Sequence, residues 1–124
     1  MQYMLLIYTP ADTPRDASTY GAYMAFSEEL QAAGQMVAGD GLEGLEAATT
    51  VRVRDDETLL TDGPFAETKE QIGGYYLLEC KDLDDALNWA AQIPEAKTGS
   101  IEVRPVLDYE AIEAATGAST EASA

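Results

Sequence analysis

Apolar residues along the chain follow two periodicities, one typical of strands and one typical of helices. A nearly continuous apolar run from Tyr3 to Tyr8 predicts a buried strand. Over residues 20–33 the apolar residues recur every three or four positions, which predicts an amphipathic helix. Asp16 or Ser18 is its expected N-cap and Gly34 its expected end. The stripe expected to face the core is Tyr20, Tyr23, Met24, Ser27, Leu30 and Ala33.

The rest of the chain reads as further strands and one more long helix. The expected elements are strands over 35–38, 49–54, 57–61, 73–80 and 100–106, and a helix from Asp82 to Pro94 with Leu83, Ala86, Leu87 and Ala90 toward the core. Apolar and polar residues alternate strictly over 49–54 and are followed by Asp55-Asp56. This pattern predicts a hairpin with Arg52 and Arg54 on one face. Residues 107–124 form a C-terminal extension, with helical turns over 108–115 and a mobile tail.

This order of elements predicts an α+β fold. Strand–helix–strand, an inserted hairpin and a second strand–helix–strand unit make a ferredoxin-like split βαβ arrangement over residues 1–106, with an antiparallel sheet. Both helices then cover one face of the sheet and leave the other open. An open apolar face requires a cover, so we expect a homodimer with its two sheets packed face to face.

Charge and composition exclude several classes of function. The 124 residues include 7 basic and 23 acidic ones, for a net charge of −16, which disfavours binding to nucleic acid or to an anionic membrane. There is no histidine and only one cysteine, Cys80, so catalytic triads and zinc, haem or iron–sulfur sites cannot be built from ordinary ligands. We therefore expect no metal and no cofactor. The first apolar run is too short for a signal peptide, which suggests a cytoplasmic protein.

One long motif is similar to a known family. The stretch TDGPFAETKEQIGGYY, from Thr61 to Tyr76, resembles the signature of the YCII-related, DGPF-domain proteins. The resemblance continues on both sides, with YMLLIY at 3–8, AYMAF at 22–26, TTVRVR at 49–54, DLDDAL at 82–87 and SIEVRPV at 100–106. It covers about residues 1–106 and implies a ferredoxin-like fold of the dimeric α/β-barrel superfamily.

The resemblance implies less about activity than about fold. Members are generally of unestablished activity, and many resemble products encoded beside sigma factors of the extracytoplasmic-function class. A His–Asp pair is proposed for the wider group, but it does not carry over to a chain without histidine.

The polar segment around the DGPF motif provides the first candidate site. Asp62 is either a turn residue or a general base, and Gly63 and Phe65 are the adjoining candidate ligand-binding residues. Glu67 and Lys69 either take part in catalysis or belong to a solvated loop with local ion pairs. The missing side chains of Gly73-Gly74 allow close approach by a ligand or by a neighbouring strand.

Arginines and tyrosines provide the second group of candidates. Arg52 and Arg54, with Arg104, can hold a carboxylate or phosphate, or can pair across strands with Glu57, Glu79 or Glu102. Tyr8, Tyr23 and Tyr76 can line a ligand cavity or belong to the core. We interpret Cys80 as a small buried hydrophobe, and Asp55, Asp56 and Glu57 as an acidic turn rather than a cation site.

Two functions fit this sequence. The first is a homodimer with a cleft for a small polar or anionic ligand and cofactor-independent acid–base chemistry. In it Asp62 or Glu67 is the base, Lys69 or the strand arginines stabilise charge, and a tyrosine donates a hydrogen bond. The alternative is a non-enzymatic acidic regulator that binds a basic protein, such as an extracytoplasmic-function sigma factor.

Overall fold

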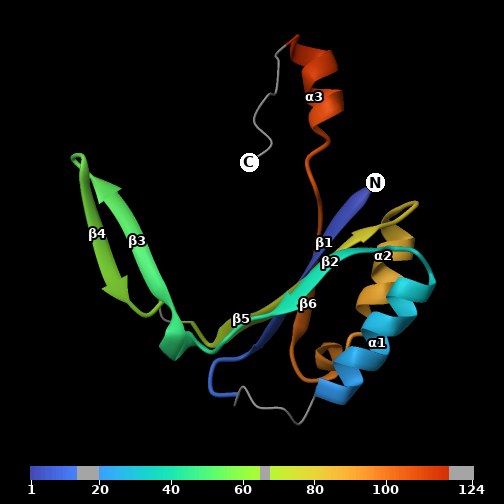
Figure 1. Cartoon of the computed structure of the whole chain (residues 1–124), viewed down its shortest axis with the longest axis horizontal. Coiled ribbons are helices and arrows are strands. Elements are labelled where there is room, and N and C mark those ends of the chain that lie inside the picture. Colours follow the sequence, from blue (N-terminus) through green and yellow to red (C-terminus); the bar gives the residue numbers. More distant parts are fainter. Residues whose placement is uncertain (14–19, 65–67, 118–124) are drawn as a thin grey trace.

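A computed structural model describes residues 1–13, 20–64 and 68–117. Its centre is a four-stranded sheet in the order β2-β5-β1-β6, beside a separate two-stranded sheet of β3 and β4 (Figure 1). The strands are β1 (Gln2–Pro10), β2 (Met36–Gly41), β3 (Thr49–Arg54), β4 (Glu57–Asp62), β5 (Glu70–Glu79) and β6 (Ser100–Pro105). The α-helices are α1 (Tyr20–Ala32), α2 (Leu83–Ala90) and α3 (Tyr109–Thr116), and 3₁₀ turns span Leu45–Ala47 and Pro94–Lys97.

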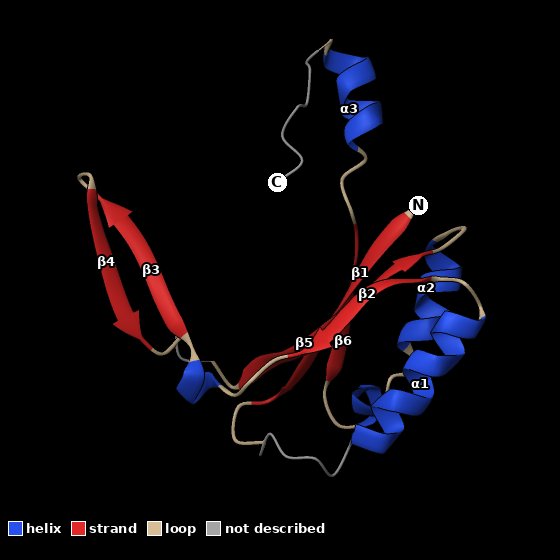
Figure 2. Ribbon diagram, in the orientation of Figure 1, coloured by secondary structure: helices blue, strands red, loops and turns tan. Residues whose placement is uncertain are grey.

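The strand order confirms the ferredoxin-like α+β prediction. Every neighbouring pair in the central sheet is antiparallel, and β5 lies between β1 and β2. Leu5 of β1 lies opposite Tyr76 of β5 on one side and Val103 of β6 on the other. Helices α1 and α2 both lie on the same face of this sheet, as expected (Figure 2).

The core forms between the sheet and these two helices. Side chains alternate along β1, so that Tyr3, Leu5 and Ile7 are buried while their neighbours face the other side of the sheet. Phe26 of α1 meets the ring of Tyr76 edge-on, with 5.2 Å between the ring centroids. Each such fully buried large side chain contributes roughly 1.5–3 kcal/mol to folding.

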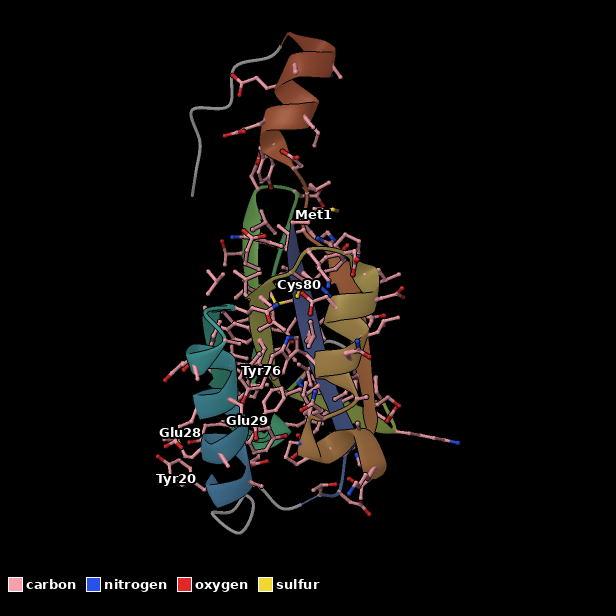
Figure 3. The ribbon with its side chains drawn as sticks, turned by 90° about the vertical axis from the view of Figure 1, so that its right-hand side faces the viewer. Met1, Tyr20, Glu28, Glu29, Tyr76 and Cys80 are labelled. Atoms are coloured by element: carbon pink, nitrogen blue, oxygen red, sulfur yellow. The ribbon has the colours of Figure 1, made fainter. Side chains whose placement is uncertain are left out.

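The two helices turn different stripes toward the core than their periodicity suggested. Tyr20 and Met24 are exposed, and Phe26 takes their place in the core with Leu30. Tyr20, Glu28 and Glu29 are exposed, and Figure 3 shows Tyr20 and Glu28 at the outer edge of α1, with Tyr76 on the inner side of the helix. Positions 23, 26 and 30 are as regularly spaced as the predicted stripe, so spacing alone did not decide between the two.

The second helix approaches the sheet through small residues. Ala86 and Ala90 are buried as expected, but Leu83 and Leu87 remain exposed, and the half-buried Trp89 packs against the core instead. The helix begins as predicted, because the side chain of Asp82 accepts a hydrogen bond from the backbone N–H of Asp85 at 2.9 Å.

Helix α1 ends where the sequence indicated. Gly34 adopts a left-handed conformation with φ of 72°, and the N–H of Gln35 donates to the carbonyl of Leu30 at 3.1 Å. The expected caps Asp16 and Ser18 lie outside the described residues.

Two elements extend away from the body of the fold. The β3–β4 hairpin turns at Asp55 and Asp56, both with positive φ, as the sequence predicted. Helix α3 lies where helical turns were expected after the last strand, and residues 118–124 of the predicted tail lie outside the described residues. Figure 1 shows both elements on the side of the sheet that α1 and α2 leave open. Among the described residues, no helix combines the length and apolar composition that a membrane crossing requires.

Candidate functional site

A cavity of about 540 Å³ lies on the open side of the sheet, where the segment after β2 crosses the ends of β1 and β5. Its walls are mostly apolar and include Tyr8, Leu42, Leu45, Pro64 and Ile72. Tyr8 and Ile72 lie opposite each other in the β1–β5 ladder and form its floor. Polar groups at its edges belong to Glu43, Thr68, Glu70 and Gln71.

Gly74 allows the segment that forms one wall of the cavity to lie close to β5. A Cβ on Gly74 would lie 2.9 Å from the carbonyl oxygen of Asp40 and 3.3 Å from Cα of Gly41, so only glycine lets β2 approach β5 this closely. The ladder then continues past β2, because the N–H of Leu42 donates to the carbonyl of Gly73 at 2.9 Å. Gly74 thus serves close approach by a neighbouring strand.

The DGPF turn forms the other edge of the cavity. Gly63 has a φ of 98°, which favours glycine, and its N–H donates to the carbonyl of Ala48 at 2.7 Å. Its own carbonyl accepts a hydrogen bond from Oγ1 of Thr50 at 2.8 Å. These bonds close the base of the hairpin and place Pro64 at the cavity wall.

A tyrosine–carboxylate pair stands beside the cavity. The hydroxyl of Tyr8 donates to Oε1 of Glu102 at 3.3 Å. Burial raises the pKa of Tyr8 above its usual value of 10.0, and the negative charge of Glu102 raises it further, with Arg104 acting in the opposite direction. The phenol therefore stays protonated at neutral pH and acts as a hydrogen-bond donor.

A second pair of the same kind lies on the same face. The hydroxyl of Tyr75 donates to Oδ2 of Asp40 at 3.3 Å, and Tyr75 is the β5 partner of Leu6 in the ladder. Neither Tyr75 nor Asp40 lines the cavity. The open face thus combines aliphatic side chains with two phenol–carboxylate contacts, one at the cavity and one away from it.

A buried amide holds the chain that follows β1. Gln71 is buried, and its Nε2 lies 3.4 Å from each of the carbonyl oxygens of Pro10, Ala11 and Thr13. Because a buried amide requires hydrogen-bond partners, this geometry ties the segment after β1 to the start of β5. Gln71 therefore holds the start of β5, which forms one edge of the cavity, in place.

The two predicted catalytic residues that the structure describes, Asp62 and Lys69, are not among the residues that line the cavity. Asp62 is exposed at the end of β4, opposite Thr49, and is not among the lining residues. Lys69 is exposed, and its carbonyl accepts a hydrogen bond from the N–H of Ala11 at 2.8 Å. Glu67 and Phe65 lie outside the described residues. The catalytic role of these side chains stays a prediction.

Among the predicted ligand-binding residues that the structure describes, only Tyr8 lines the cavity. Arg52 and Arg54 lie on the hairpin, where Arg54 stands opposite Glu57 and its Nη1 donates to the carbonyl of Val53 at 2.9 Å. Tyr76 and Tyr23 belong to the core side of the sheet, as the core interpretation expected.

The buried hydroxyl of Tyr76 is satisfied within that core. It forms a hydrogen bond of 2.9 Å with Oγ of Ser27. Burial raises the pKa of Tyr76, partly offset by this hydrogen bond. Tyr76 thus faces the helices, on the opposite side of the sheet from the cavity.

Several site residues escaped the sequence analysis. Leu42 and Leu45 lie in a glycine-rich stretch between the predicted strands 35–38 and 49–54, where no apolar periodicity marks them. Glu102 was considered only as a partner for arginine, because its closeness to Tyr8 depends on the β1–β6 register. Strand alternation alone would place Ile72 on the core face, because it lies three positions before Tyr75; the register irregularity in the β1–β5 ladder between them brings it to the open face opposite Tyr8.

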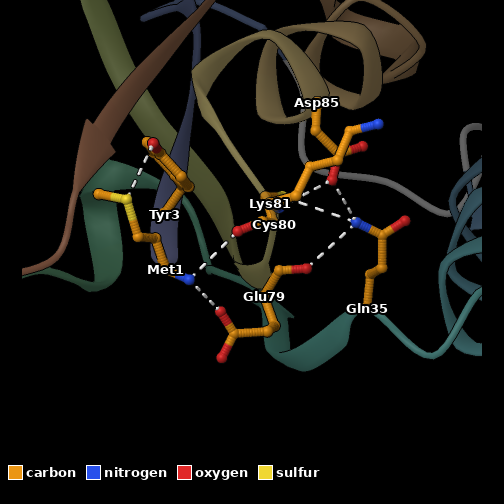
Figure 4. Close-up of polar contacts among 7 residues, drawn as sticks. All are labelled: Met1, Tyr3, Gln35, Glu79, Cys80, Lys81 and Asp85. Atoms are coloured by element: carbon orange, nitrogen blue, oxygen red, sulfur yellow. Dashed lines mark hydrogen bonds and ion pairs between the residues drawn. The ribbon is translucent and has the colours of Figure 1, made fainter.

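Cys80 is the buried, unreactive thiol that the sequence suggested. It is almost completely buried, and burial together with the nearby Asp85 raises its pKa to about 11. Around it, Nε2 of Gln35 donates to the carbonyl of Glu79 and to Oδ2 of Asp85, and the N-terminal ammonium contacts the carboxylate of Glu79 at 2.6 Å (Figure 4). Within the described ranges, no group of three or more potential ligands is placed to hold a metal ion.

Part of the chain is similar in sequence to a known protein. The chain is 52% identical over 65 residues to an uncharacterized protein of Rhizobium meliloti strain 1021, a match that covers 51% of this chain and 52% of that protein. The chain thus spans about half the length of this relative. The comparisons do not support a sigma-factor partner or the regulator alternative.

The fold is similar to that of an enzyme of known structure. This enzyme is the 5-chloro-2-hydroxyhydroquinone dehydrochlorinase TftG of Burkholderia phenoliruptrix AC1100, solved in complex with 2,5-dihydroxybenzoquinone. The similarity has a TM-score of 0.50 and 14% sequence identity, and covers 86% of this chain and 94% of that one. The similarity concerns the fold alone and agrees with the ferredoxin-like arrangement of the sheet and helices. The model of the YCII-related domain matches residues 1–110, and the chain therefore belongs to the YCII-related family.

Proposed function

We propose that this protein binds a small, neutral, ring-shaped compound with hydroxyl or carbonyl groups in the cavity on its open sheet face. The observation that carries this proposal is an apolar cavity of about 540 Å³ beside the Tyr8–Glu102 pair. That volume lies within the range of small-molecule sites, and such sites combine apolar walls with a few placed polar groups. The flat faces of Tyr8 and Pro64 suit a ring.

The charges around the cavity favour a neutral ligand. Glu43 and Glu70 contribute carboxylates to the lining, and among the described residues no lysine or arginine lines it. The net charge of −16 adds a general repulsion of anions. This arrangement argues against the anionic ligand that Arg52 and Arg54 suggested, since both arginines lie on the hairpin.

The tyrosine–carboxylate pair supplies the acid–base groups of the proposal. On ligand binding the Tyr8 hydroxyl, protonated at neutral pH, turns from Glu102 to donate to a ligand oxygen, and the Glu102 carboxylate then accepts a hydrogen bond from a ligand hydroxyl. The similar fold of TftG, whose structure contains the ring compound 2,5-dihydroxybenzoquinone, supports a single ring with hydroxyl or carbonyl groups as the ligand.

The proposal includes a homodimer formed through the open face. Met4, Leu6 and Leu77 are only half-buried on this face, and Ile72 is 40% exposed. A second copy packed against these side chains would remove them from water and close the cavity.

A titration followed by ¹H–¹⁵N NMR tests the binding site. Resorcinol serves as a neutral ring and benzoate as an anion of similar size. We expect resorcinol to shift the amide signals of Tyr8, Leu42 and Ile72, and benzoate to bind at least tenfold more weakly. Leu42→Trp would fill the cavity and abolish binding, whereas Leu87→Trp, at an equally exposed leucine of α2, would leave it unchanged. Equal binding by wild type and Leu42→Trp would refute the site.

A second pair of variants tests the acid–base group. Tyr8→Phe removes the hydroxyl at the cavity, and Tyr75→Phe removes an equivalent hydroxyl away from it, with the same 3.3 Å hydrogen bond to a carboxylate. A hydrogen bond is worth about 1 kcal/mol, so Tyr8→Phe should weaken resorcinol binding roughly fivefold. Equal effects of the two substitutions would contradict the role of Tyr8.

A further inference from the structure

Two buried polar side chains each hold an oxygen that has no hydrogen-bond partner among the described residues. One is Oγ1 of Thr9, near the end of β1, and the other is Oε2 of Glu95, in the 3₁₀ turn Pro94–Lys97. The two residues are only 1% and 9% exposed. Buried polar groups are normally hydrogen-bonded, and a buried carboxylate is normally paired with a positive charge. The two oxygens therefore point to a ligand that is not part of the chain.

Both side chains belong to the same end of the core, on the helix side of the sheet. A Cβ on Gly99 would meet the carbonyl oxygens of both Tyr8 and Glu95, so the turn that carries Glu95 packs directly against β1 beside Thr9. Side chains alternate along β1, and Thr9 is one of those that face the helices. Glu95 acts on the same side, because burial raises the pKa of Tyr76 and the charge of Glu95 raises it further.

The hydrogen-bond donors around these oxygens serve other acceptors. Gln71 lies opposite Thr9 in the β1–β5 ladder, but its Nε2 is directed at three backbone carbonyls that follow β1. The hydroxyls of Tyr76 and Ser27 bond to each other at 2.9 Å. The two oxygens do not bond to each other either, although a threonine hydroxyl can donate to a carboxylate. A third group that donates to both would satisfy them.

The chemistry of the two oxygens favours a small cation that carries N–H donors. An ionised carboxylate only accepts hydrogen bonds, so the ligand must donate. Within the described ranges no lysine or arginine pairs with Glu95, and Lys97, two positions along the chain, is exposed. A calcium ion requires six to eight oxygen ligands, and the described part of the chain has no group of three potential metal-ligating side chains. An ammonium group requires fewer acceptors, and the net charge of −16 attracts it.

We propose that the protein binds a protonated amino group, that of an ammonium ion or of a small primary amine, between the carboxylate of Glu95 and the hydroxyl of Thr9. The amino group donates one hydrogen bond to Oε2 and one to Oγ1, and its charge balances that of the carboxylate. A bridging water would supply the hydrogen bonds but not the charge. This site lies on the opposite face of the sheet from the proposed ring-binding cavity and does not depend on it.

A titration with ammonium chloride, followed by ¹H–¹⁵N NMR, tests the site. We expect saturable shifts of the amide signals of Thr9, Glu95 and Gly99. Potassium chloride at the same ionic strength should not produce them, because potassium is similar to ammonium in size and charge but has no N–H donor. Methylammonium chloride distinguishes the two sources of the amino group: comparable binding indicates a primary amine, and binding of ammonium alone indicates the free ion. An equal response to potassium and ammonium would overturn the proposal.

Substitutions assign the binding to the two oxygens. Glu95→Gln removes the charge with little change of shape and should abolish the saturable shifts, and Thr9→Val removes the hydroxyl and should weaken ammonium binding roughly fivefold. Glu28→Gln removes the same charge from an exposed glutamate of α1 and should bind ammonium like wild type. Undiminished binding by Glu95→Gln would overturn the proposal, and so would a wild type without saturable shifts, which would leave water as the partner of both oxygens. If a variant fails to fold, the comparison of ammonium with potassium on the wild type still decides.

Discussion

Replacing Gly99 by alanine probes how tightly the turn before β6 packs against β1. A Cβ at this position would lie 2.0 Å from the carbonyl oxygen of Tyr8 and 3.4 Å from that of Glu95, and both are backbone atoms that cannot rotate away. The N–H of Gly99 also donates to the carbonyl of Glu95 at 2.7 Å, which holds the turn in place. The new methyl group and the Tyr8 carbonyl must therefore separate, at the point where Tyr8 pairs with Ser100.

The expected loss of stability has two sources, both caused by that separation. Forcing an extra methyl group into a filled space costs about 1–3 kcal/mol, and losing a ladder hydrogen bond costs about 1 kcal/mol more. We therefore expect Gly99→Ala to lower the free energy of unfolding by about 2–4 kcal/mol and Tm by about 10 °C. Urea unfolding followed by the fluorescence of Trp89, which packs against the core, measures the change.

A second glycine gives a control with the opposite sign. Gly21 lies in the first turn of α1, and a Cβ there would meet nothing within 4 Å. Alanine has the higher helix propensity, so Gly21→Ala should stabilise the protein by about 0.5 kcal/mol. If Gly99→Ala matched wild type to within about 0.5 kcal/mol while the control behaved as expected, the argument from the close approach of Tyr8 would be refuted.

Two further predictions concern buried groups. The pKa of Cys80 is about 11 in the folded protein and 9.0 as a model thiol, so the folded state holds its proton more tightly and stability should fall as pH rises from 9 to 11. Between pH 8 and pH 10.5, urea unfolding of the wild type should show the free energy of unfolding fall by about 2 kcal/mol, and Cys80→Ala should show a smaller fall. If the free energy falls equally in Cys80→Ala, groups other than Cys80 cause the pH dependence. Tyr76→Phe removes the hydrogen bond to Ser27 and should lower the free energy of unfolding by about 1 kcal/mol without changing resorcinol binding. A reduced affinity for resorcinol would show that Tyr76 contributes to the binding site.

The candidate site was predictable only in part. Turn chemistry identified Gly63, and the requirement for close approach identified Gly74, because each depends on backbone sterics that a single residue expresses. Tyr8 was among the candidates, but its partner Glu102 lies 94 positions away and meets it only through the β1–β6 register. Asp62, the most prominent polar residue of the motif, lies in a strand end outside the cavity lining.

The sequence by itself determined the elements and their order. Alternation along the strands, the Asp82 cap, the Gly34 end of α1 and the Asp55-Asp56 turn are local effects, encoded within a few residues of where they act. Tertiary structure alone decided which helix stripe was buried, because Phe26 and Tyr20 offer equally regular spacings and only packing against Tyr76 separates them. It also decided where the cavity lies, since its walls come from four separate segments that meet through sheet register and glycine contacts rather than through any local pattern.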